Sequence, residues 1–254
     1  MLTMPSNQTQ LPNASDAANL FGTQNNREIL QQLEQERSLV ETTCYGIASV
    51  MVTGMAFGNA IVAVGAVSLF GVSSRKLQKL GQLLQSGTAI VDSFETEGVE
   101  IFPRIEVPNC QPIDLFVRFP NKEFLLISIR SLSGATVVYN EAIETLQIRR
   151  KNKGLKKWAA DPLSELSEQE LWLRKNRRDL FGGSSNDARR PLAKLLVLSE
   201  ETKFDEHSDG LYREINNEKF FTIKQKGTIS IVSDNQIVEF IRAYLAQRQQ
   251  AGKA

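Results

Sequence analysis

The sequence predicts an α/β protein in which a long apolar helical segment precedes the folded domain. The chain carries no charged residue from Tyr45 to Val72, and this run exceeds the roughly 20 apolar residues that a membrane-spanning helix needs. After it, short runs of apolar β-forming residues alternate with segments of helical periodicity. The 30 Lys and Arg residues balance the 29 Asp and Glu residues, so net charge favours no class of partner.

The first part of the chain, residues 1–26, is rich in Asn, Gln, Ser and Thr and poor in large apolar residues. It has too little apolar surface to offset the entropy of ordering, so we expect a disordered tail. It also lacks the basic start and apolar run of a signal peptide. From Arg27 to Thr43 a sparse apolar stripe predicts a polar helix, which is either solvated or makes a short coiled-coil contact.

The apolar segment, residues 44–73, is expected to lie in a membrane. A single helix of this length would have to tilt to fit a hydrocarbon core. Alternatively, Gly58 and Asn59 near its centre break it into two arms, each too short to cross. The segment is then a re-entrant hairpin or a buried hairpin in a soluble fold.

Small residues mark one side of this segment. Gly54 and Gly58 form a GxxxG pair, and Gly65 follows nearby. Small residues let helix backbones approach closely in lipid, so we expect these glycines to pack helices together and to favour self-association. The alternative is that small residues are merely common in such helices. The cations between Arg75 and Lys79 outnumber those just before the segment, so the positive-inside rule puts the C-terminal domain in the cytoplasm.

The folded domain is expected at residues 75–246, followed by a polar tail at 247–254. It opens with an amphipathic helix from Arg75 to Glu95, whose leucines recur at helical spacing. Three strands follow, of which the second and third form a hairpin around the turn at Pro120–Lys122. These strands are expected at Val99–Val107, Ile113–Phe119 and Phe124–Ser131.

Two helices and a second group of strands complete the domain. The helices are expected at Asn140–Arg150 and Ser167–Leu180, the second of which begins in a capping-box sequence. The apolar run Ala193–Leu198 predicts a buried strand. A hairpin and a closing helix are then expected at Phe220–Lys224, Thr228–Val232 and Ile237–Leu245.

Cysteine and histidine chemistry receives little support from the sequence. Cys44 and Cys110 are far apart and show neither a pairing pattern nor metal-ligand spacing. The single histidine, His207, lies in an acidic polar stretch. One histidine argues against most zinc sites and against a Ser-His-Asp triad.

An acidic residue on the second predicted strand suggests a family. Asp114, in Pro112-Ile113-Asp114, and the strand Ile127-Ser128-Ile129-Arg130-Ser131 resemble the core of the PD-(D/E)xK, restriction-endonuclease-like nucleases. More narrowly, the chain is similar to the nuclease-related domain often found beside membrane segments. The resemblance covers residues 75–245. It implies a mixed sheet flanked by helices, with an acid on one strand and an acid-x-lysine on the next that hold a divalent metal such as Mg²⁺.

The chain departs from this motif at two positions. Ser128 stands where the second acid is expected, and Arg130 stands where the lysine is expected. Strand alternation puts both on one face of the sheet. A hydroxyl does not replace a carboxylate as a ligand for a hard cation, and arginine stays protonated. We therefore expect a degenerate catalytic motif at Asp114, Ser128 and Arg130.

Two other interpretations of Asp114 stay open. It remains the metal ligand of an active nuclease if another acid has migrated into the site, and Glu123, Glu141 and Glu144 are the candidates. Otherwise Asp114 simply braces a hairpin.

The densest basic stretch of the chain predicts a binding surface. Clustered cations beside aromatic residues suit phosphate contacts with base stacking, so DNA or RNA is the expected partner. Anionic lipid headgroups are an alternative, as is a solvated loop with no specific role. The expected nucleic-acid-binding residues are Arg149, Arg150, Lys151, Lys153, Lys156, Lys157 and Trp158.

These expectations together describe a membrane-anchored protein with an inactive nuclease-like domain that binds nucleic acid or a protein partner. An active Mg²⁺-dependent nuclease with a rearranged site is one alternative. A membrane scaffold that assembles through its glycine-rich helix is another.

Overall fold

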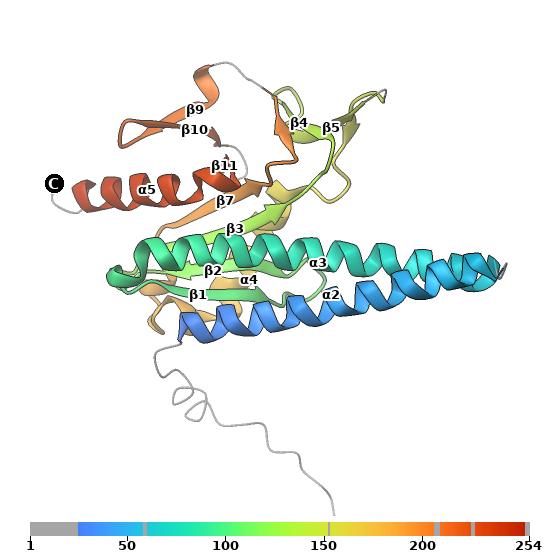
Figure 1. Ribbon diagram of the computed structural model, residues 1–254. Helices are drawn as coiled ribbons and strands as arrows, with labels where there is room; N and C mark the ends of the chain where they lie inside the picture. Colours follow the sequence, from blue (N-terminus) through green and yellow to red (C-terminus); the bar gives the residue numbers. More distant parts are fainter. Residues whose placement is uncertain (1–24, 58–59, 152, 206–208, 225–226, 252–254) are drawn as a thin grey trace, which may run out of the picture.

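A computed structural model describes residues 25–57, 60–151, 153–205, 209–224 and 227–251. Residues 1–24 of the predicted disordered tail, Gly58 and His207 therefore lie outside the described residues, whereas Asn25 and Asn26 at the end of that predicted tail are the N-cap and first residue of α2. Two long helices, two β-sheets and two shorter helices make up the fold (Figure 1). The helices are α2 (Asn26–Ala56), α3 (Ala60–Phe94), α4 (Pro162–Asn176) and α5 (Ile237–Ala251). Short 3-10 turns lie at Glu95–Glu97, Arg178–Phe181, Asp187–Arg189, Asp209–Leu211 and Asp234–Gln236.

The apolar segment is divided between α2 and α3, which pack side by side as a helical hairpin (Figure 1). α2 ends at Ala56 and α3 begins at Ala60. The interpretation as one straight helix is therefore wrong, and the alternative of a break near Gly58 and Asn59 agrees with these bounds. Among the described residues, α2 alone has the length and composition of a membrane-crossing helix, a test that core helices of soluble proteins and signal sequences also pass.

The two ends of the hairpin have different surroundings. Near its base, Leu30 of α2 and Leu83 and Phe94 of α3 are buried against the main sheet. Toward its tip, which extends beyond both sheets in Figure 1, large apolar side chains are exposed on both helices, among them Tyr45, Val52, Phe57, Val64 and Val72. Burial of apolar surface therefore stabilises the base, whereas the apolar side chains at the tip stay exposed in the part of the chain that the structure describes.

The main sheet has seven strands in the order β1-β2-β3-β7-β11-β10-β9. The first three run antiparallel, β3, β7 and β11 run parallel, and the last two return antiparallel. One face packs on α3 and α5 and the other on α4, so the prediction of a mixed sheet flanked by helices is confirmed. The strands are β1 (Glu100–Ile105), β2 (Ile113–Arg118), β3 (Phe124–Arg130), β7 (Leu192–Leu198), β9 (Tyr212–Ile215), β10 (Glu218–Ile223) and β11 (Ile229–Ser233).

A second, four-stranded sheet corrects the sequence analysis. The segment Asn140–Arg150, expected to be a helix, contributes instead to an antiparallel hairpin of β4 and β5. Burial alternates along β4, as in a strand with one face on a core, and Glu144 in the turn has a positive φ that a helix does not allow. The sheet, in the order β6-β5-β4-β8, consists of β4 (Ala135–Asn140), β5 (Thr145–Arg150), β6 (Lys156–Lys157) and β8 (Lys203–Phe204).

The connections fix where this small sheet lies. β4 follows the C-terminal end of β3, and β8 follows that of β7. The small sheet therefore lies beyond the C-terminal edge of the parallel strands, toward the same end of the molecule as the hairpin tip (Figure 1).

Several helix boundaries also differ from expectation, among them those of α4 and α5. α4 begins at Pro162, not at Ser167, because Asp161 is the N-cap and its carboxylate accepts a hydrogen bond from the Leu163 N–H. Ser167 sits inside the helix and donates to the Leu163 carbonyl. α5 continues to Ala251, so the expected tail at 247–254 begins within a helix.

Candidate functional site

The three motif residues lie at the ends of neighbouring strands. Leu115 of β2 pairs with Ile127 of β3, so Asp114 and Ser128 are one step further along the same ladder. Asp114, Ser128 and Arg130 share the sheet face that α4 covers, since Phe116 and Leu126 of the same parity belong to the core on that side. The structure therefore brings the predicted residues together on one face.

One oxygen of the Asp114 carboxylate is engaged by three protein donors. Its Oδ2 accepts hydrogen bonds from the Ile129 N–H at 2.6 Å, Lys79 Nζ at 2.7 Å and an Arg130 guanidinium nitrogen at 2.9 Å. Asp114 is buried, and only 8% of its side chain is exposed. Charge-assisted hydrogen bonds of this kind are among the stronger ones in proteins.

A second carboxylate completes the network. The other terminal nitrogen of Arg130 donates to Glu165 Oε2 of α4 at 2.6 Å. Two cations and two carboxylates therefore alternate along the chain of contacts Lys79, Asp114, Arg130 and Glu165, which we call the Asp114 network. Burial lowers the pKa of the Lys79 amine and nearby Arg130 lowers it further, while Asp114 opposes both effects.

Lys79 and Glu165 belong to this site, although no sequence pattern pointed to them. Lys79 is 35 residues from Asp114, and Glu165 is 35 residues from Arg130. Their local signals are weak, because Lys79 resembles any polar residue on an amphipathic helix and Glu165 resembles the usual acid in a first helical turn.

The network forms one wall of a cavity of about 460 Å³. The remaining lining is partly apolar and comes from the helical hairpin, β1 and the strand connections. The lining residues are Lys76, Lys79, Leu80, Leu83, Arg104, Gln111, Pro112, Asp114, Arg130, Trp158, Ala160 and Glu165.

The residues at this site do not fit Mg²⁺. A hard divalent cation requires several oxygen ligands, but Asp114 Oδ2 already accepts three hydrogen bonds and Arg130 lies between the two carboxylates. Within the described part of the chain, no three His, Cys, Asp or Glu residues gather as a metal cluster would require. Ser128 offers only a buried hydroxyl, whose oxygen has no hydrogen-bond partner among the described residues.

None of the acids considered as migrated ligands joins Asp114. Glu123 accepts hydrogen bonds from Tyr244 and Arg248 of α5. Glu141 and Glu144 lie in the turn between β4 and β5. This way of rebuilding the metal site is therefore wrong.

The predicted basic stretch lies on the small sheet, and its six cationic side chains are exposed. They follow β5 into β6, beside a cavity of about 660 Å³ lined in part by Arg149, Arg150, Lys151, Lys153 and Lys203. Arg149 forms an ion pair with Asp205 at 3.2 Å. We call residues Arg149–Lys157 the basic edge.

Trp158 does not belong to this surface. Its side chain is buried and lines the Asp114 cavity, and its backbone N–H donates to the Leu146 carbonyl. The expectation that Trp158 stacks on bases is therefore wrong, because its side chain is part of the hydrophobic core.

The glycines of the apolar segment occupy two different environments. Gly54 is buried within the hairpin, as are Cys44 and Ala66 of the same apolar segment. Gly65 is exposed, and a Cβ added there would meet no atom within 4 Å. Gly54 therefore serves the contact between α2 and α3, while Gly65, like Gly46 and Gly71, faces outward.

Comparison of this chain with protein-family models, with curated proteins and with solved structures finds no match in any of the three.

Proposed function

We propose that this protein is a membrane-anchored, non-catalytic relative of the restriction-endonuclease-like nucleases that binds nucleic acid through its basic edge. The observation that carries the loss of catalysis is the position of Arg130. Its guanidinium bridges Asp114 and Glu165, so the carboxylates that would hold a metal neutralise arginine instead. The element order supports the kinship, because a helix and a three-stranded antiparallel meander are followed, after the inserted strands β4–β6, by a helix and a strand parallel to the third.

Nucleic acid is the partner that suits the basic edge best. Six exposed cations lie within nine residues, and only Arg149 has an ion-pair partner among the described residues. Unpaired lysines and arginines along an exposed edge neutralise backbone phosphates and release counterions. Because Trp158 is buried, stacking contributes nothing, and binding is expected to depend strongly on salt and weakly on sequence.

The hairpin tip supports the membrane anchor. At 1.5 Å per residue, the charge-free arms Tyr45–Ala56 and Ala60–Val72 are about 18–20 Å long, less than the roughly 30 Å of a hydrocarbon core. Both arms return to the folded domain, so the hairpin enters the bilayer from one side without crossing it. The hydroxyls of Ser49, Thr53 and Ser68 each donate to the carbonyl four residues earlier, which satisfies them without water.

Nucleic-acid binding is tested with the full chain in detergent micelles. We would measure its affinity for labelled single-stranded DNA and RNA across a salt series, with Mg²⁺ present. Lys151→Glu/Lys153→Glu is expected to weaken binding at least tenfold and to reduce the slope of log K against log salt by roughly 1.5. The matched control, Lys175→Glu/Arg178→Glu, reverses two exposed cations next to the C-terminal end of α4 and is expected to change little.

Two results would contradict this proposal. Equal binding by the basic-edge variant and the wild type would remove nucleic acid as the partner of the basic edge. Cleavage that disappears in Asp114→Ala would mean that the site is an active nuclease.

Membrane anchoring is tested by flotation with lipid vesicles. Val52→Glu/Val64→Glu introduces charge on both exposed arms and is expected to prevent flotation, because charge in a hydrocarbon core is costly. Leu171→Glu, at an equally exposed apolar position on α4, is the control and should float like the wild type. A soluble, monomeric wild-type chain that does not float would overturn the anchor.

A second partner for the basic edge is favoured by its location. The small sheet and the hairpin tip lie toward the same end of the molecule (Figure 1), so the lysines are suited to anionic headgroups of the membrane that the hairpin enters. Flotation with vesicles that contain or lack phosphatidylserine distinguishes this candidate. Only lipid binding predicts that Lys151→Glu/Lys153→Glu weakens flotation on the anionic vesicles alone.

A further inference from the structure

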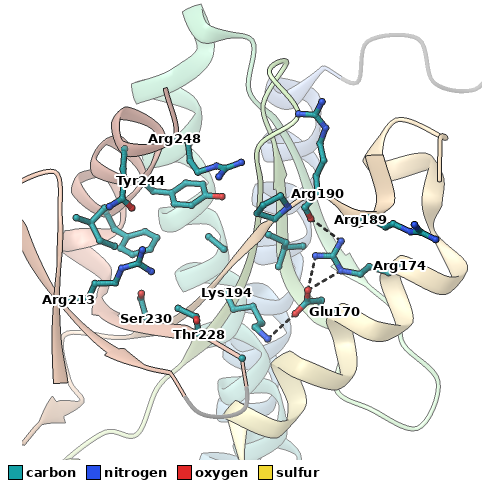
Figure 2. A pocket seen from close by; sticks show the side chains of 17 residues that line it. Glu170, Arg174, Arg189, Arg190, Lys194, Arg213, Thr228, Ser230, Tyr244 and Arg248 are labelled. Carbon is teal, nitrogen blue, oxygen red and sulfur yellow. Dashed lines mark hydrogen bonds and ion pairs between the residues drawn. The ribbon is translucent and has the colours of Figure 1, made fainter. Parts of the chain in front are cut away.

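A third cavity lies at the opposite ends of the parallel strands from the Asp114 network, which is next to the C-terminal end of β3. It has a volume of about 650 Å³ and opens at the N-terminal ends of β7 and β11. Its walls come from α4, the segment before β7, β9 and the C-terminal half of α5 (Figure 2). We call it the Lys194 cavity, after the lysine of β7 on its floor.

The lining of this cavity is strongly cationic. In Figure 2 the basic side chains come from different walls of the cavity, and that of Arg189 extends away from the others. The lining contains six cations and a single carboxylate, that of Glu170. Two carboxylates outside the lining also form ion pairs with these cations: Glu123 with Arg248, and Asp187 with Arg190. Three positive charges are therefore in excess even after these outer partners are counted. The cations are Arg174, Arg189, Arg190, Lys194, Arg213 and Arg248.

The cations differ in how firmly the protein holds them. Lys194 is buried, with Nζ 2.8 Å from Glu170, and Arg174 donates to the same carboxylate at 2.7 Å. Arg190 is only loosely paired, at 3.4 Å from Asp187. Arg189 and Arg213 are exposed and have no ion-pair partner among the described residues. The Lys194–Glu170 ion pair is therefore held by the protein, whereas the side chains of Arg189 and Arg213 are exposed to solvent.

The rest of the lining suits a small organic molecule. Ile215, Phe240 and Tyr244 supply apolar surface beside the hydroxyls of Thr228 and Ser230. A volume of this size lies within the range of about 300–1,000 Å³ that small-molecule sites occupy. Guanidinium groups bind phosphate oxygens through paired hydrogen bonds, which makes arginine the usual residue for this task.

We infer that the Lys194 cavity binds a small, soluble molecule that carries phosphate. The excess positive charge calls for an anionic ligand, and the apolar wall accommodates an organic group attached to it. The headgroups of the membrane that the hairpin enters are out of reach, because α5 and the start of β7 lie at the other end of the molecule (Figure 1). The site is also separate from the basic edge, with which it shares no lining residue.

The inference is tested by calorimetric titration of the full chain in detergent micelles with three probes: inorganic pyrophosphate, AMP and adenosine. Pyrophosphate and AMP are expected to bind and to compete, and adenosine, which lacks phosphate, is not. Arg189→Gln/Arg213→Gln is expected to weaken both phosphate probes at least tenfold. The control Lys151→Gln/Lys153→Gln, on the basic edge, should leave them unchanged. Thermal melting verifies that both double variants fold.

The outcomes separate this inference from the proposed function. Absence of phosphate binding, or equal loss in both double variants, would overturn the inference without affecting the anchor or the basic edge. A single-stranded oligonucleotide that displaces AMP and loses affinity in Arg189→Gln/Arg213→Gln would replace the small ligand by nucleic acid. Displacement by phosphatidate vesicles would identify a lipid phosphate as the source. A phosphate probe lost only in the cavity variant, and displaced by neither, supports the inference.

Discussion

The Asp114 network and the Lys194 cavity lie at opposite ends of the parallel strands of one sheet. They differ in how far their charges are neutralised by the chain itself. At the first, Lys79 and Arg130 meet two carboxylates of the same chain. At the second, six cations share one carboxylate within the lining and two outside it. A charge that is paired with an opposite charge of the same chain contributes to the stability of the fold. An excess of positive charge instead favours the binding of an anion. We therefore propose that the Asp114 network is structural and that the Lys194 cavity is the better candidate for a ligand site.

The largest expected effect tests whether the Asp114 network stabilises the fold. Asp114→Ala removes the acceptor of Lys79, Arg130 and the Ile129 N–H at once. We expect a loss of about 3 kcal/mol in the free energy of unfolding, at the low end for broken buried ion pairs because Lys79 is partly exposed. Chemical denaturation measures it.

Asp114→Asn is the matched control for this variant. The amide oxygen still accepts the Ile129 N–H bond, so the loss should be smaller. A cost below about 1 kcal/mol for Asp114→Ala would mean that the network does not brace the fold.

A smaller effect on stability is expected from the ion pair between Lys194 and Glu170 in the Lys194 cavity. Lys194→Met removes one partner of Glu170, but Arg174 continues to bind that carboxylate. Methionine also fills most of the space of the lysine stem. The expected loss is about 1–2 kcal/mol by the same measurement. A loss as large as that of Asp114→Ala would show that the two regions are equally dependent on their ion pairs, and the comparison would fail.

The stability contributed by Glu170 should depend on pH. Burial acts to raise the pKa of this carboxyl, but hydrogen bonds from Lys194 and Arg174 outweigh it, and the pKa is lowered from 4.5. A carboxyl whose pKa is lower in the folded state stabilises the fold above its ordinary pKa and loses this effect as pH falls through the lowered value. The difference in thermal stability between wild type and Glu170→Gln should therefore be largest near neutral pH and shrink below pH 4.5. A difference in thermal stability that grows as the pH falls would contradict a lowered pKa of Glu170 in the folded state.

The smallest expected effect concerns the rim of the Lys194 cavity. Arg189→Gln/Arg213→Gln removes two exposed charges that have no ion-pair partner among the described residues. Without ligand, the free energy of unfolding should change by no more than about 0.5 kcal/mol. A larger loss would mean that these arginines brace the protein as the Asp114 network does.

Prediction from the sequence succeeded where a local pattern decides the outcome. The apolar runs of β2, β3 and β7 contain nearly continuous Leu, Ile, Val and Phe, and these strands form as expected. It failed between Asn140 and Arg150, where helical spacing of a few apolar residues competed with strand-forming neighbours. There the hairpin buries Val137, Tyr139 and Leu146 against the main sheet, a gain that no local pattern contains.

The sequence alone determined the α/β class, the charge-free apolar segment, and the common face of Ser128 and Arg130, since each depends only on neighbours within a few residues. The tertiary structure alone decided that Lys79 and Glu165 neutralise the motif, that Trp158 is core, and that arginines from distant segments surround Lys194. Such contacts join residues tens of positions apart, and their free energy comes from packing and charge pairing that exist only once the chain has folded.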